Sequence, residues 1–278
     1  MEGGWSMTND ETMRADAALA ARGLAPSRER AWALIEAGLA TVNGVPIDRP
    51  ARRVTEVDRL EVIGDTHPYV SRGGLKLEKA LNVFGVDVSG LVCLDVGAST
   101  GGFTDVLLRS GARRVYAVDV GTAQLHESLR GDPRVTSMER VNARALTRAM
   151  FPEPPALAVM DVSFISIRLI LPALFEVLGE NGRVISLIKP QFEAGRQRIG
   201  KNGIVSKPGT HRAVLKEIVD FAPTLGWRVA ALDFSPIAGG DGNVEFLADM
   251  RPEDCCKATV NDADIDDVVR KAHGTRLR

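Results

Sequence analysis

Apolar runs and amphipathic segments alternate along most of the chain after residue 90. Short apolar runs have the length and branching of buried strands, and apolar positions at helical spacing predict helices between them. The expected strands are 91–94, 115–118, 134–138, 157–160, 183–188, 227–234 and 243–250. The expected helices are 70–81, 103–108, 142–150, 167–178 and 209–225, with a further short one in 251–278. This alternation predicts a doubly wound α/β sheet that ends in a β-hairpin.

The first 64 residues have a different pattern. Helices are expected at 14–23 and 27–38, and Asn43-Gly44 between two short apolar runs predicts a hairpin. A last strand is expected at 60–63. We therefore expect three regions: a disordered tail over 1–13, a small α+β domain over 14–64, and the larger α/β domain over 65–278. The joint between the two domains is expected at Gly64 to Pro68.

Composition narrows the class of protein. The chain has 278 residues, of which 45% are hydrophobic and 26% charged, as in ordinary globular domains. Its net charge of −1 gives no overall electrostatic signature of nucleic-acid binding, so any basic surface must be local. No apolar run approaches the ~20 residues that span a bilayer, and the N-terminus does not resemble a signal peptide. The three cysteines show no metal-binding spacing. We expect a cytoplasmic protein with no membrane segment and no metal.

A glycine turn follows the strand at 91–94. Asp95 precedes Gly97, Gly101 and Gly102, a helix follows, and the next strand ends at Asp119. This is half of a nucleotide-binding sheet, in which the final acid can accept both ribose hydroxyls. The spacing differs from the dinucleotide fingerprint, and Asp95 would repel a phosphate but suit a sulfonium. The turn therefore favours S-adenosylmethionine over NAD, although an ordinary tight turn between strand and helix remains the alternative.

Charged residues stand where strands of the predicted sheet end. Asp161 and Lys189 each follow an apolar strand directly, so both are expected beside the cofactor at the carboxyl edge of the sheet. Glu245 alternates with apolar neighbours at the start of the last strand and is expected to face inward. Lys76 lies in the first turns of the helix at 70–81. Taken alone, a lysine at the position of Lys76 is usually just solvated, and an acid at the position of Glu245 is more often a salt-bridge partner.

Together these four residues resemble the Lys-Asp-Lys-Glu tetrad of FtsJ-like RNA 2′-O-methyltransferases. The surrounding sequence also matches one branch of that family. The matching words are S-R-G-G-L-K-L at 71–77, D-V-G-A-S-T-G-G-F-T-D at 95–105, D-V-S-F-I-S at 161–166, K-P-Q-F-E at 189–193 and G-N-V-E-F at 242–246. The resemblance implies a Rossmann-like domain that binds S-adenosylmethionine through Asp95, Gly97, Ser99, Gly101, Gly102, Phe103, Asp119 and Asp161.

The N-terminal region resembles a small RNA-binding module shared by a ribosomal protein, pseudouridine synthases and tyrosyl-tRNA synthetases. The matching words are R-x-D-x-x-L-x-x-R-G at 14–23, S-R-x-x-A-x-x-L-I-x-x-G at 27–38 and V-N-G at 42–44. With this module in front, the chain resembles the TlyA (hemolysin A) family, which implies 2′-O-methylation of cytidine in ribosomal RNA. The residues expected to contact RNA phosphates are Arg14, Arg22, Arg28, Arg30, Arg72, Arg196, Arg198 and Lys201.

The chemistry explains why such a tetrad is needed. A ribose 2′-hydroxyl is a poor nucleophile at neutral pH, so its proton must be removed or its developing charge stabilised. A lysine acts as base if burial and a nearby cation lower its pKa. We assign this role to Lys189, with Lys76 as the neighbouring charge and Asp161 and Glu245 orienting both ammonium groups.

The segment 189–216 is expected to grip RNA, because it carries seven lysines and arginines and one acid. A solvated surface loop is the alternative interpretation. Two other functions also stay open for the whole chain. One is methylation of a protein or small molecule, and the other is a non-enzymatic RNA-binding or hemolysin-like protein.

Overall fold

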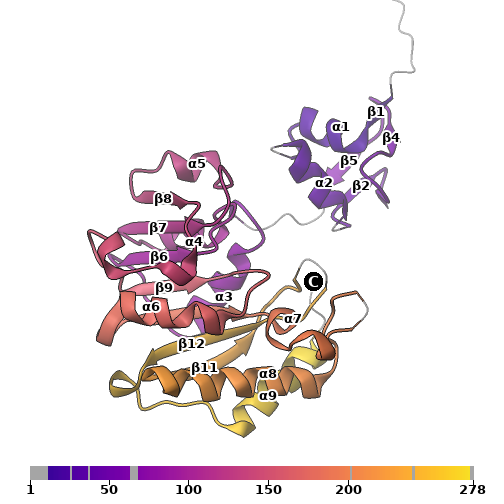
Figure 1. The fold of residues 1–278 in the computed structure, drawn as a ribbon. Coiled ribbons are helices and arrows are strands. Elements are labelled where there is room, and N and C mark those ends of the chain that lie inside the picture. Colours follow the sequence, from indigo (N-terminus) through magenta and orange to yellow (C-terminus); the bar gives the residue numbers. More distant parts are fainter. Residues whose placement is uncertain are drawn as a thin grey trace, which may run out of the picture. The chain divides into compact units, whose positions relative to one another are not determined.

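The fold comes from a computed structural model that describes residues 12–25, 27–36, 38–62, 68–200, 202–239 and 242–275. The chain divides into two compact units, residues 1–66 and residues 67–278 (Figure 1). The expected linker falls mostly on residues outside the described ranges, as does the expected tail up to residue 11.

The N-terminal unit combines two helices with two small antiparallel sheets. Its elements are β1 (Met13–Arg14), α1 (Ala15–Ala21), α2 (Arg28–Glu36), β2 (Ala40–Val42), β3 (Val45–Pro46), β4 (Arg53–Val54) and β5 (Leu60–Val62). One sheet has the order β3-β2-β5, and the other pairs β1 with β4. Asn43 and Gly44 both have positive φ, at 52° and 79°, which a type I′ hairpin turn requires. The pairing of β1 with β4 was not predicted, because runs of two residues carry no periodicity.

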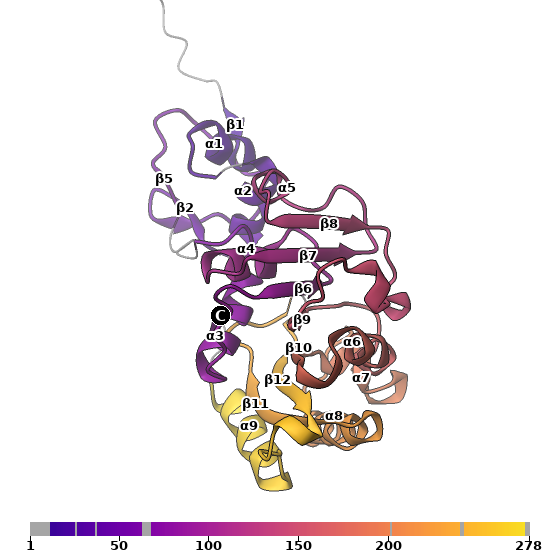
Figure 2. The same cartoon turned by 90° about the vertical axis from the view of Figure 1, so that its left-hand side faces the viewer.

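The larger unit is built on a seven-stranded sheet with the order β11-β12-β10-β9-β6-β7-β8 (Figure 2). The strands are β6 (Val92–Val96), β7 (Arg114–Asp119), β8 (Val135–Glu139), β9 (Leu157–Met160), β10 (Arg183–Ile188), β11 (Trp227–Phe234) and β12 (Phe246–Pro252). β6 to β10 run parallel to one another, and β12 is inserted antiparallel between β10 and β11. This mostly parallel sheet confirms the predicted Rossmann-like methyltransferase fold.

Helices cover both faces of this sheet. The helices are α3 (Gly74–Val83), α4 (Gly102–Arg109), α5 (Glu127–Arg130), α6 (Leu171–Leu178), α7 (Pro190–Glu193), α8 (Pro208–Phe221) and α9 (Asp262–Gly274). Side chains from α3, α4 and α5 share one buried apolar cluster with the sheet, and those from α6, α8 and α9 share another. α8 and α9 pack together beside β11 (Figure 1).

Two local predictions were wrong. The helix expected at 142–150 is two separate 3₁₀ turns, Ala143–Ala145 and Arg148–Met150. Leu146 and Thr147 between them are extended, and Leu146 is buried in the core, so helical spacing there reflects burial of single side chains. Glu245 does not begin the last strand, because β12 starts at Phe246. The short helix α5 was not expected at all.

Candidate active site

The four tetrad residues come from four separate segments that the fold brings to one edge of the sheet. Asp161 follows β9 and Lys189 follows β10, and these neighbouring strands run parallel. Ile188 pairs with Phe246, so Glu245 enters β12 opposite the point where Lys189 leaves β10. Lys76 reaches the same edge from α3, which packs against β12.

The tetrad is a chain of alternating charges. The Lys76 Nζ lies 2.6 Å from Glu245 Oε2 and 3.5 Å from Asp161 Oδ2. The Lys189 Nζ lies 2.6 Å from the other oxygen of Asp161 and donates a hydrogen bond to Ser163 Oγ at 2.9 Å. Side-chain exposure is 3% for Glu245 and at most 19% for the other three tetrad residues. Asp161 therefore bridges two ammonium groups in a largely desolvated setting.

The surroundings of Lys76 keep it charged. Burial alone would lower the pKa of this ammonium, but the charges of Asp161 and Glu245 outweigh burial and raise the pKa above its usual value. Lys76 is then a permanent cation at neutral pH. Such a group stabilises developing negative charge but cannot accept a proton.

The glycine turn approaches the tetrad closely. Gly97 has φ of +82°, and a Cβ there would lie 2.7 Å from the backbone oxygen of Asp161. A Cβ on Gly101 (φ +95°) would lie 2.3 Å from the Leu129 side chain. These glycines therefore let protein segments pack against one another.

The carboxylates of Asp95 and Asp119 flank the turn, and they differ in burial and in their hydrogen-bond partners. Asp95 is fully buried, accepts a hydrogen bond from Thr104 Oγ1 at 2.7 Å, and burial raises its pKa to about 7. Its second oxygen has no hydrogen-bond partner among the described residues. Asp119 accepts hydrogen bonds from the backbone N–H groups of Ser99 at 2.8 Å and Gly121 at 2.7 Å. A small hollow lies between Ser99 and Asp119.

These features suit S-adenosylmethionine. The unpartnered oxygen of Asp95 is a buried acceptor near a turn, and an acceptor of this kind favours a cationic ligand. Asp119 borders the hollow, where ribose hydroxyls would find an acceptor. Phe103 is buried in the core with Leu107, and its expected contact with the cofactor stays a prediction.

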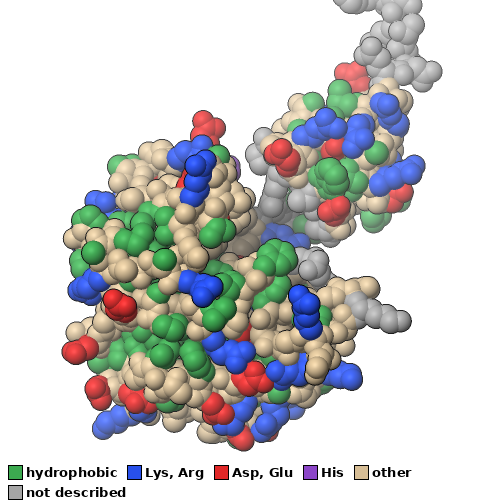
Figure 3. All heavy atoms as spheres, viewed as in Figure 1, with side chains coloured by type: hydrophobic (Ala, Val, Ile, Leu, Met, Phe, Trp, Pro, Cys, Tyr) green, Lys and Arg blue, Asp and Glu red, His purple; other side chains and the backbone are tan. Residues whose placement is uncertain are grey.

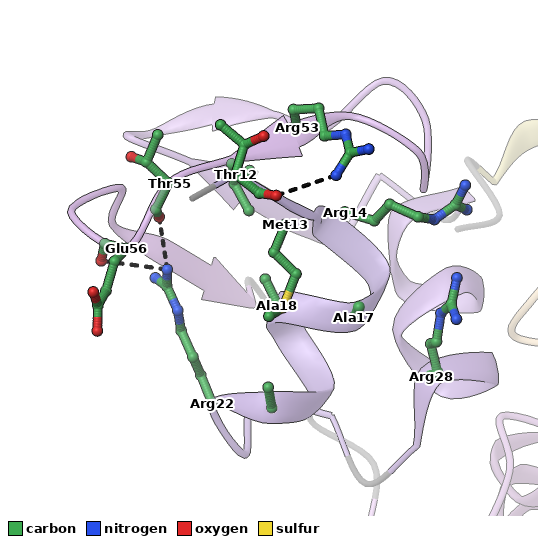
Figure 4. Close-up of a pocket in the computed structure, with 12 residues that line it drawn as sticks. Thr12, Met13, Arg14, Ala17, Ala18, Arg22, Arg28, Arg53, Thr55 and Glu56 are labelled. Atoms are coloured by element: carbon green, nitrogen blue, oxygen red, sulfur yellow. Dashed lines mark hydrogen bonds between the residues drawn. The ribbon is translucent and has the colours of Figure 1, made fainter. Parts of the chain in front are cut away.

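Four arginines of the N-terminal unit, Arg14, Arg22, Arg28 and Arg53, line one pocket (Figure 4). Arg14 and Arg28 both donate hydrogen bonds to the buried carboxylate of Asp16, at 3.0 and 3.1 Å. Arg22 instead donates to the backbone carbonyls of Thr55 and Asp58. The side chain of Arg30 lies outside the described residues. Arg14 and Arg28 thus keep donors free beyond the one carboxylate they share, whereas Arg22 supports the turn after β4.

The charge count over 189–216 was wrong as a measure of basic surface. Arg198 pairs with Glu217, and Arg212 pairs with Asp262 and Asp266 of α9. Lys216 pairs with Asp220. These acids follow the counted segment in sequence but lie beside it in space, and Figure 3 shows blue and red side chains interspersed on this unit.

Arg72, Arg196 and Lys201 were also expected to contact RNA. Within the described part of the chain, the side chains of Arg72 and Arg196 have no ion pair or hydrogen bond to another residue. Lys201 lies outside the described residues.

Sequence reasoning missed two polar side chains of the site. Ser163 accepts the hydrogen bond from Lys189, and Glu193 is a buried acid one turn beyond it. Both lie inside matched sequence words, D-V-S-F-I-S and K-P-Q-F-E, but only Asp161 and Lys189 in those words had been given a role.

Among the described residues, no helix has the length and apolar character needed to cross a bilayer. No group of three or more His, Cys, Asp or Glu side chains there could hold a metal ion.

Comparison with known proteins gives two family matches. Residues 69–251 match the FtsJ-like methyltransferases, and residues 13–60 match the S4 domain. The 16S/23S rRNA (cytidine-2′-O)-methyltransferase TlyA of Mycobacterium tuberculosis is 44% identical over 86% of this chain and 90% of that protein. Hemolysin A of Brachyspira hyodysenteriae is 44% identical over 85% of this chain and 98% of that protein. The solved structure of a candidate hemolysin from Streptococcus thermophilus, with 48% identity, covers 95% of this chain and 96% of that one with a TM-score of 0.76.

Proposed function

The chain belongs to the FtsJ-like methyltransferase family and carries an S4 domain, and we propose that it is an S-adenosylmethionine-dependent rRNA (cytidine-2′-O)-methyltransferase. One observation carries this proposal: the charge chain Glu245–Lys76–Asp161–Lys189 meets at the carboxyl edge of the sheet, beside the glycine turn. The Mycobacterium tuberculosis relative named for this activity is matched over 86% of this chain and 90% of its own length, which supports ribosomal RNA as the substrate.

Lys189 is the proposed base for the 2′-hydroxyl. Its nitrogen donates a hydrogen bond to Ser163 and is ion-paired with Asp161 at 2.6 Å, and its remaining side is proposed to face the ribose oxygen. Lys76, held as a cation by Glu245 and Asp161, stabilises the oxyanion that forms as the proton leaves. Both carboxylates orient the ammonium groups, and much of the rate comes from holding these atoms in register.

S-adenosylmethionine supplies a methyl group on a sulfonium, which is electrophilic enough for an oxygen to attack in line. The residues proposed to hold it are Asp95, Gly97, Ser99, Gly101, Gly102, Asp119 and Asp161. Asp95 offers its unpartnered oxygen to the cationic end, and Asp119 borders the hollow proposed for the ribose. Phe103 supports the turn from the core.

The domain over 14–64 is the proposed grip on ribosomal RNA. Arg14 and Arg28 are the leading phosphate contacts there, because each keeps free N–H donors beyond the bonds to Asp16. In the domain over 65–278, Arg72 and Arg196 are the proposed contacts. Action on ribosomal RNA places the protein in the cytoplasm.

The test is transfer of a tritiated methyl group to purified ribosomal subunits, followed by nuclease digestion and chromatography. We expect label in 2′-O-methylcytidine and none after Lys189→Ala. Label on a protein or on a small molecule would show that the substrate is not RNA. If the protein is intact and binds the cofactor but transfers no label, a non-enzymatic role is favoured.

A further inference from the structure

Glu193 is a buried acid that the tetrad mechanism does not use. It ends α7, four residues after Lys189, and only 4% of the residue is exposed. Its Oε2 accepts a hydrogen bond from Ser166 Oγ at 2.6 Å, and its Oε1 accepts one from the backbone N–H of Ile167 at 2.7 Å. The only cation paired with it among the described residues is Arg168, at 3.5 Å.

These bonds hold the far end of the loop that carries two partners of Lys189. The loop leaves β9 at Asp161 and reaches Ile167, and Lys189 contacts its near end through Asp161 and Ser163. The segments 161–167 and 189–193 are therefore joined at both ends, by Lys189 at one and by Glu193 at the other. The rings of Phe164 and Phe192 also lie 5.2 Å apart between these two joints.

The loop has a backbone that needs such support. Phe164 has φ of +65° although its side chain is 91% exposed, so no burial of its ring stabilises the left-handed conformation. A non-glycine residue is strained in this conformation, which persists only where the surroundings fix it. Glu193 caps the end of this strained stretch with two short hydrogen bonds.

Resting on the proposed function, we infer that Glu193 is a positioning residue for methyl transfer. It fixes the loop 161–167 so that Asp161 and Ser163 stand where they hold the Lys189 amino group. The site then includes, besides the four charged residues, the two hydrogen bonds from Ser166 and Ile167 to Glu193, which set the position of the Lys189 amino group. Burial raises the pKa of Glu193, while the hydrogen bonds from Ser166 and Ile167 and the charge of Arg168 favour its ionised form.

Two substitutions separate hydrogen bonding from charge. In Glu193→Gln the amide oxygen still accepts from Ile167 N–H, and the amide N–H can donate to Ser166 Oγ, whose hydroxyl rotates. We expect kcat within about 3-fold of wild type and an unchanged pH–rate profile. Glu193→Ala removes both bonds, and we expect kcat to fall by roughly 100-fold, as for a misplacement of about 1 Å, while the KM for the methyl donor stays within about 3-fold.

The matched control is Glu217→Ala. Glu217 is also paired with Arg168 but has no recorded contact with the loop 161–167, so kcat should stay near wild type. Amide hydrogen exchange of the peptide covering 161–170 gives a readout that does not depend on activity. Exchange should accelerate in Glu193→Ala and stay slow in Glu193→Gln and Glu217→Ala.

Several outcomes would overturn the inference. A Gln variant as inactive as Ala would show that the charge or proton of Glu193 matters, and a folded Ala variant with normal kcat and slow exchange would remove any positioning role. If Glu193→Ala does not fold, Ser166→Ala, which deletes one bond, must lower kcat with little change in KM. If wild type methylates no ribosomal RNA, the proposed function fails, and hydrogen exchange still decides whether Glu193 anchors the loop.

Discussion

The two units of this protein each place two cations around one carboxylate, and the two clusters differ in burial. In the methyltransferase unit Asp161 stands between Lys76 and Lys189, whose side chains are each 10% exposed. In the N-terminal unit Asp16 stands between Arg14 and Arg28, whose side chains are 39% and 59% exposed. The two cations are therefore desolvated in one unit and exposed in the other, whereas the central carboxylate is buried in the N-terminal unit, with the Asp16 side chain only 3% exposed.

Because of this difference in burial, we expect similar ion pairs to have different roles in the two units. In a desolvated cluster each charge depends on its partners, and removing one leaves another buried and uncompensated. At the surface water screens the loss, and the arginines keep donors free for an incoming anion. The comparison predicts that substitutions in the tetrad change catalysis and stability strongly, whereas substitutions around Asp16 act mainly on RNA binding.

Lys189→Ala should have the largest effect. It removes the proposed base and one partner of Asp161, and we expect kcat to fall by about 10³-fold or more, within the range for general acid–base groups with lost positioning. Binding of S-adenosylmethionine, measured by calorimetry, should change by less than about 3-fold. Turnover near the wild-type rate would show that Lys189 is not the base. It would also contradict the expectation that substitutions in the tetrad change catalysis more than those around Asp16.

Glu245→Ala should cost the most stability. It takes the 2.6 Å partner from Lys76 and leaves that ammonium buried with Asp161 alone, a loss of about 4 kcal/mol by analogy with broken buried pairs. Urea unfolding measures the loss. Asp16→Ala is the comparison in the other unit. Equal destabilisation by the two substitutions would show that burial of Lys76 does not make the loss of its partner more costly.

The pH dependence of stability should reveal Asp95, a buried acid that forms no ion pair within the described part of the chain. Its pKa is about 7 in the folded protein and near 3.8 in an unfolded chain, so the folded state binds more protons between these values. By linkage, the contribution of Asp95 to stability falls as pH rises from about 4 to 7, by roughly 3 kcal/mol.

Asp95→Asn isolates this contribution, because the difference in urea midpoint between variant and wild type should move in favour of the variant from pH 5 to pH 8. A difference that does not change with pH would show that Asp95 is ionised throughout. The variant should also bind S-adenosylmethionine more weakly at pH 8, where only wild type carries the charge.

Arg28→Ala and Arg22→Ala should have the smallest effects and should differ from each other. Arg28→Ala should change stability by less than about 1 kcal/mol, because Arg14 still pairs with Asp16. It should weaken RNA binding and lower the slope of log K against log salt by about 1. Arg22→Ala loses bonds to carbonyls and should lower stability by about 1 kcal/mol while leaving the salt slope unchanged.

Much of this molecule follows from local sequence. The strands β9, β10 and β11 begin and end at the predicted residues. β9 and β10 are buried inside the sheet and are almost entirely apolar, as such strands must be, whereas β11 is a half-exposed edge strand. The hairpin at Asn43-Gly44 follows from the backbone angles that these two residues tolerate. The tetrad residues were identified from the words around them, and the parallel order of β9 and β10 already required Asp161 and Lys189 to share an edge.

Only the tertiary structure decided which charges meet. Acids from α9 pair with Arg212, and Glu217 pairs with Arg198, so the charge count over 189–216 overstates the basic surface that this segment presents. The joining of Glu193 to the loop after β9 has the same origin. The physical reason is that burial and ion pairing depend on how separate segments pack, and the periodicity of a single segment carries no record of its neighbours across the sheet.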